Sequence, residues 1–105
     1  MFPTSKFGIS TDAVYHSTKK ENLEGILKSG LVPHESFDYC KGFYKLIFGS
    51  VDLNRLWEFD NNVVLKINGK NYQWFKDTNL YRCKWSVCTN ERIDPKDIEI
   101  IETKL

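Results

Sequence analysis

The sequence predicts an α+β domain with two short helices in its N-terminal half and a mostly antiparallel sheet. Apolar residues recur at helical spacing over residues 19–29, and several later segments are rich in β-branched and aromatic residues separated by turn signals. The chain has 105 residues, 41% of them hydrophobic. That size and composition are typical of one folded domain, so we expect a single domain over residues 1–105.

The clearest local pattern is a strand followed by a helix. Residues 13–16 favour a strand because they are β-branched, aromatic or small. Thr18 and Glu21 have the spacing of a capping box, which predicts a helix over residues 19–29. Gly30 then stands where the residue after a helix prefers positive φ, which glycine adopts without strain.

The rest of the chain alternates apolar segments with turn-forming residues. It predicts a surface loop over 34–42, a strand over 43–48, a second helix over 52–59, strands over 63–67 and 71–75, a half-buried strand over 81–87 and a last strand over 98–101. Asn68-Gly69 is the strongest short-range signal for a hairpin, because both turn positions favour positive φ. Asp94-Pro95 predicts a capped turn before the final strand.

Composition excludes several classes of function. Fifteen basic and 14 acidic residues give a net charge near zero, which argues against a general nucleic-acid coat. No apolar run approaches the ~18 residues that span a membrane, and the N-terminus does not resemble a signal peptide. Three cysteines without C-x-x-C spacing and only two histidines predict a reduced cytoplasmic protein without a metal site.

Several motifs then follow one another in a recognisable order. They are Tyr15-His16-Ser17-Thr18, Asn22-Leu23-x-x-Ile26-Leu27-x-x-Gly30-Leu31, Leu46-Ile47-Phe48-Gly49-Ser50, the segment 63–67 and Ile93-x-Pro95-x-x-Ile98. This order resembles the ADP-ribosyltransferase-like fold, which includes poly-ADP-ribose polymerase-type enzymes, RNA 2′-phosphotransferases and small bacterial toxins that modify DNA or protein. The resemblance covers roughly residues 13–101, and it implies a site that binds NAD+.

The resemblance also implies which residues bind that cofactor. The family histidine hydrogen-bonds a ribose hydroxyl and matches His16. The next residue, Ser17, would present its backbone to the nicotinamide amide, and an aromatic side chain on a later strand would stack on the nicotinamide ring. The expected cofactor-binding residues are Tyr15, His16, Ser17, Thr18, Tyr44 and Phe48. The alternative for His16 is a structural histidine inside the core, with one ring nitrogen hydrogen-bonded within the protein and the other unused.

The family's catalytic acid has no clear counterpart. A glutamate on a late strand would support the positive charge that develops on the ribose, but the matching positions hold Lys84 or Ser86. Glu91 and Glu58 are the remaining candidates for the catalytic acid. We therefore expect slow or absent NAD+ cleavage, and whether the protein is an enzyme stays open.

The sequence leaves three candidate functions. The first is a domain that binds NAD+ or an ADP-ribose-type nucleotide, with mono-ADP-ribosyl transfer to a protein or nucleic acid left open. The second is a catalytically degenerate interaction protein, such as a toxin or a host–virus conflict inhibitor, that blocks a partner. The third is RNA 2′-phosphotransferase-like chemistry, which the lack of clustered basic residues disfavours.

Overall fold

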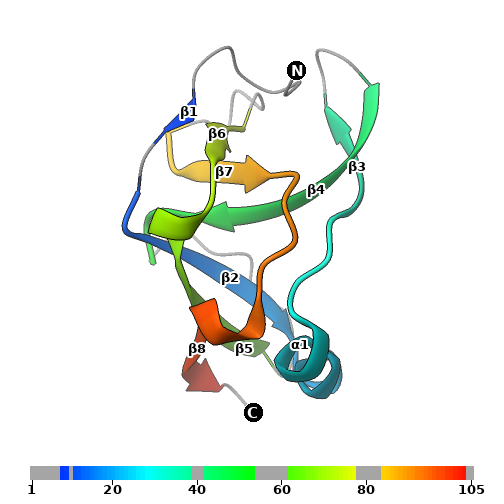
Figure 1. The fold of residues 1–105 in the computed structure, drawn as a ribbon, viewed down its shortest axis with the longest axis vertical. Coiled ribbons are helices and arrows are strands. Elements are labelled where there is room, and N and C mark those ends of the chain that lie inside the picture. The colour runs from blue at the N-terminus through cyan, green and yellow to red at the C-terminus, as the bar shows by residue number, and fades with distance from the viewer. Residues whose placement is uncertain (1–7, 10, 39–41, 54–61, 78–83, 104–105) are drawn as a thin grey trace.

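Strands dominate the structure of this protein. The computed structural model describes residues 8–9, 11–38, 42–53, 62–77 and 84–103 (Figure 1). Its strands are β1 (Gly8–Ile9), β2 (Ala13–Lys19), β3 (His34–Asp38), β4 (Gly42–Ser50), β5 (Asn62–Asn68), β6 (Trp74–Lys76), β7 (Ser86–Thr89) and β8 (Ile98–Thr103). Within those ranges the helices are α1 (Leu23–Ser29) and three short 3-10 turns, η1 (Lys20–Asn22), η2 (Gly69–Asn71) and η3 (Pro95–Asp97).

The sheet consists of two halves that meet at one narrow contact. The strand order is β1-β6-β7-β4-β2-β5-β8, all neighbours are antiparallel, and β3 pairs with β4 beside this path. All seven residues of β2 pair with β5, but β2 pairs with β4 only through Tyr15 and Ser50. We call the β4–β2 boundary the seam, β1-β6-β7-β4 the first half-sheet and β2-β5-β8 the second half-sheet. Figure 1 shows β4 and β2 diverging from this contact.

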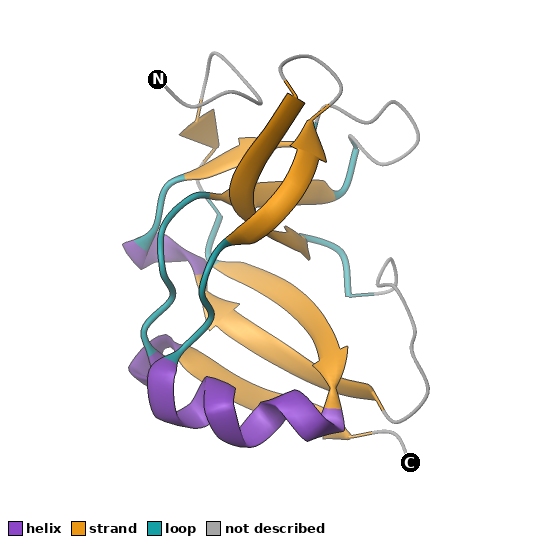
Figure 2. Ribbon diagram, turned by 90° about the vertical axis from the view of Figure 1, so that its right-hand side faces the viewer, coloured by secondary structure: helices purple, strands orange, loops and turns teal. Residues whose placement is uncertain are grey.

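The two half-sheets share one hydrophobic core, which explains why they form one domain despite the narrow seam. Helix α1 lies against the second half-sheet (Figure 2) and contributes Ile26. The other buried members of the core come from both half-sheets and their connections: Val14, Leu31, Ile47, Val63, Leu65, Ile67, Trp74, Val87 and Ile93. A smaller cluster of Leu46, Phe75 and Cys88, with Phe48 packed against it, lies in the first half-sheet.

The predicted fold class is wrong. We expected an α+β, ADP-ribosyltransferase-like fold with two short helices, but the described structure is mostly sheet with one seven-residue α-helix. The predicted helix over 52–59 begins in a segment, residues 51–53, that forms a bend and a turn. The remainder of that prediction lies outside the described residues. The Ser50 hydroxyl accepts from the N–H of Asp52 (3.0 Å) at the end of β4.

The first helix begins later than its capping signal predicted. Thr18 belongs to β2, where it lies opposite Val63, and neither η1 nor α1 has a side-chain cap at its start. All residues of β2, Thr18 included, pair with β5, and this pairing keeps Thr18 in the strand instead of at the start of the helix. The end of the helix is as predicted. Gly30 has φ of +83°, and its N–H donates to the Ile26 carbonyl (2.7 Å).

The hairpin predicted at Asn68-Gly69 is wrong. Strand β5 pairs with β2 and β8, whereas β6 pairs with β1 and β7 in the other half-sheet. The N–H of Gly69 donates to the Asp12 carbonyl (3.0 Å), and the Asn68 side chain accepts from Lys70 N–H (3.4 Å). The chain crosses between half-sheets because this buries Trp74 completely, with its indole N–H bonded to the Gly69 carbonyl (3.1 Å).

Other strand predictions have mixed outcomes. Strands predicted over 43–48, 63–67 and 98–101 are confirmed within β4, β5 and β8. The loop predicted over 34–42 is wrong where the structure describes it, because residues 34–38 form β3 and pair with β4. Residues 39–41 lie outside the described residues. Of the half-buried strand predicted over 81–87, residues 81–83 lie outside the described residues and residues 84–85 form a turn. Strand β7 covers 86–89, and all four of its residues are buried between β4 and β6. The capped turn is confirmed, with Asp94 accepting from Lys96 N–H (3.0 Å).

Candidate functional site

His16 lies at the seam and bridges its two strands. Its Nδ1 atom is 2.7 Å from the Phe48 main-chain oxygen on β4. A carbonyl can only accept, so Nδ1 carries the hydrogen, and in the neutral ring Nε2 has a free lone pair. Burial lowers the pKa of His16 below its ordinary value, which the Phe48 bond partly opposes and the charge of His34 reinforces. The ring is therefore neutral at pH 7, and the residue is partly exposed.

The other predicted residues of β2 divide between the two faces of the strand. His16 lies opposite Leu65 and Thr18 opposite Val63, so both side chains share the face of the large core. Thr18 is buried, and its hydroxyl accepts from the Asn22 side chain at 3.5 Å. The structure thus gives Thr18 a packing role beside His16.

Tyr15 and Ser17 belong to the opposite face of β2, because side chains alternate along a strand. Tyr15 is partly exposed and lies between Ser50 of β4 and Lys66 of β5. The Ser17 hydroxyl is buried and has no hydrogen-bond partner within the described part of the chain. The structure therefore does not bring Tyr15 or Ser17 to the same face as the His16 ring.

The two aromatic candidates on β4 are placed differently. Tyr44 lies opposite Ser36 in the stretch of β4 that pairs with β3, four residues before Phe48. The Phe48 side chain packs against the small cluster of the first half-sheet. What Phe48 brings to His16 is its main-chain carbonyl rather than its ring.

Neither proposed catalytic acid is shown beside His16. Glu91 follows β7, is exposed, and accepts the N–H of Gln73 at 2.7 Å. Glu58 lies outside the described residues. Lys84 is an exposed turn residue two positions before β7.

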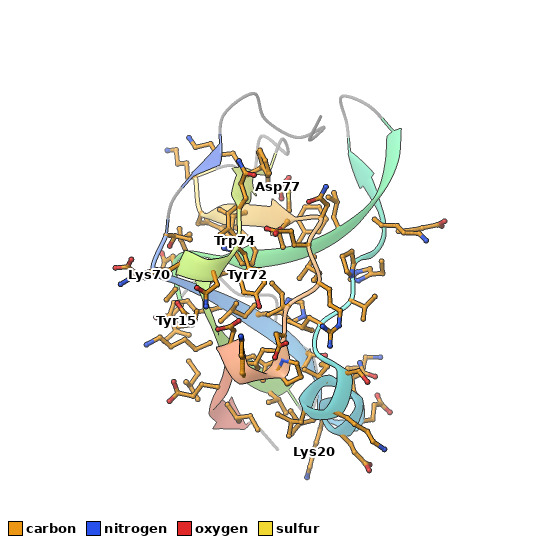
Figure 3. All side chains as sticks on the ribbon, in the orientation of Figure 1. Tyr15, Lys20, Lys70, Tyr72, Trp74 and Asp77 are labelled. Atoms are coloured by element: carbon orange, nitrogen blue, oxygen red, sulfur yellow. The ribbon has the colours of Figure 1, made fainter. Side chains whose placement is uncertain are left out.

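Sequence reasoning missed a buried carboxylate next to one position expected for the acid. Ser86 opens β7, and its hydroxyl donates to Asp77 Oδ2 at 2.8 Å. Both side chains are almost fully buried. Figure 3 shows Asp77 in the first half-sheet, beyond Trp74. The Asp77-Thr-Asn sequence indicated only a turn, and pairing of β6 with β7 was needed to reveal this contact.

The connection from β7 to β8, residues 90–97, ties the half-sheets together, and we call it the strap. Leu31 and Ile93 exchange two main-chain hydrogen bonds of 3.0 and 2.9 Å. The Tyr72 hydroxyl donates to Asp97 Oδ2 at 2.6 Å, from the connection between β5 and β6. The pKa of Tyr72 is raised, mainly by burial of its hydroxyl and further by the hydrogen bond to Asp97. The strap therefore fixes the two half-sheets from outside the seam.

An open hollow of about 410 Å³ lies beside the strap, and none of the predicted site residues is among its lining residues. Its lining residues are Asp12, Lys66, Asn68, Lys70, Lys96, Asp97, Ile98 and Glu99. Three of these side chains are cationic and three are anionic, so the hollow has no net preference for an anion or a cation.

The described residues contain no group of three or more metal-ligating side chains, and no helix among them has the length and apolar character needed to cross a membrane. In comparisons with known proteins, no family model and no curated protein matches this sequence. The function must therefore be argued from the seam itself.

Proposed function

We propose that this protein binds a nucleotide of the NAD+ or ADP-ribose type at the seam, with a ribose hydroxyl donating to His16 Nε2. The observation that carries the proposal is the 2.7 Å contact between His16 Nδ1 and the Phe48 carbonyl. This contact commits Nδ1 as a donor and leaves Nε2 as the acceptor. A ligand group at Nε2 must therefore be a hydrogen-bond donor, as a sugar hydroxyl is.

The same tautomer argues against recognition of a phosphate by His16. Phosphate oxygens are acceptors, and a neutral ring with Nδ1–H already bonded offers them nothing at Nε2. Burial also keeps the ring from charging at pH 7, because it lowers the pKa of His16. This disfavours the RNA 2′-phosphotransferase-like alternative and favours recognition of a ribose.

Binding, rather than transfer, is the activity we propose. Cleavage of NAD+ needs a carboxylate near the ribose to support developing positive charge. The Glu91 carboxylate, in the strap, accepts a hydrogen bond from the Gln73 N–H, and the buried Asp77 carboxylate accepts one from Ser86 in the first half-sheet. We therefore expect nucleotide binding with slow or absent ADP-ribosyl transfer.

Calorimetric titration with NAD+ and with ADP-ribose tests the proposal. His16→Ala should weaken binding by about 1–3 kcal/mol, the usual cost of removing one partner of a buried hydrogen bond. His34→Ala is the matched control, because His34 is the second of the two histidines in the chain and is exposed. Analogues of ADP-ribose that each lack one ribose hydroxyl should identify the donor.

Two outcomes would contradict the proposal. One is equal affinity in His16→Ala and His34→Ala, since a bond to Nε2 must be lost only in the first. The other is the absence of measurable binding by the folded native protein, which would favour the interaction-protein alternative. Intact-mass spectrometry after incubation with NAD+ would reveal transferred ADP-ribose and separate an active transferase from a binding domain.

A further inference from the structure

We draw no further inference here: the strongest candidate, the outer edge of β8 with the exposed side chains of Ile100 and Ile101, pairs with no strand other than β5 among the described residues, and nothing in that part of the structure shows what covers it.

Discussion

The Nδ1 atom of His16 hydrogen-bonds the main-chain oxygen of Phe48 across a boundary where two neighbouring strands exchange only one residue pair. A side-chain hydrogen bond thus links β2 and β4 next to the point where their main-chain pairing ends. Because the two half-sheets share one core and are tied by the strap, this bond joins parts of a domain that is already continuous. It fixes the ring of His16 more than it holds the fold together.

The first prediction concerns stability in acid. The folded-state pKa of His16 is lowered from 6.5, so the unfolded chain binds a proton more readily. The contribution of His16 is fully present above about pH 6.5 and is lost as the pH falls through the folded-state pKa. Urea unfolding followed from pH 8 to pH 5 should therefore show declining stability below pH 6.5. In His16→Gln, which cannot titrate, this component should vanish. A decline of equal size in the variant would assign it to other groups.

The second prediction compares two glycines of the same helix region. A Cβ at Gly30 would overlap the Ile93 carbonyl oxygen, and the residue has φ of +83°. Gly30→Ala should therefore lower the free energy of unfolding by about 1–3 kcal/mol. Gly25 is exposed within α1 and has no atom within 4 Å of an added Cβ. Gly25→Ala should raise stability by about 0.5–1 kcal/mol. Thermal unfolding of both variants tests this contrast. A change in stability of the same sign and size in both variants would refute the role assigned to the strap.

The third prediction concerns the bond between Tyr72 and Asp97 at the strap. Tyr72→Phe should cost about 1–3 kcal/mol, because the hydroxyl donates to a carboxylate and also accepts the Asp94 N–H (2.9 Å). In a double-mutant cycle with Asp97→Asn, the free energies of unfolding lost in the two single variants should sum to more than the loss in the double variant. Simple additivity would mean that the two side chains do not act as a pair. Since the pKa of Tyr72 is raised, native stability should also decline above about pH 10, less so in Tyr72→Phe.

The fourth prediction concerns catalysis. NAD+ turnover should be slow or absent in the native protein, because the Glu91 carboxylate is bonded to the Gln73 N–H and the buried Asp77 carboxylate to Ser86, rather than being shown beside His16. The comparison is between the native chain, Glu91→Gln and Glu58→Gln, with nicotinamide release as the readout. Robust turnover that one of these variants abolishes would identify that glutamate as the catalytic acid and would show that the protein is a transferase.

Local signals in the sequence predicted several elements and one end of the helix. Strands over 43–48, 63–67 and 98–101 follow from β-branched and aromatic runs, which fit a pleated sheet wherever they pair. Gly30 and the Asp94-Pro95 turn follow from backbone preferences of single residues. These are properties that a short segment carries by itself.

Pairing partners were beyond the reach of local patterns. The Asn68-Gly69 signal predicted a hairpin, yet the chain crosses into the other half-sheet, where Trp74 is completely buried. Thr18 signalled a cap, yet pairing with β5 keeps it in a strand. In each case a non-local contact stabilised a backbone path that local preference alone disfavoured.

For the candidate site, the sequence by itself determined that a histidine lies on an early strand, next to Ser17 and Thr18. Only the tertiary structure decided its chemistry. The Phe48 carbonyl, 32 positions along the chain, fixes the tautomer of His16, and burial at the seam keeps the ring neutral. A ring's protonation depends on the atoms that surround it, and folding brings those atoms from distant parts of the sequence.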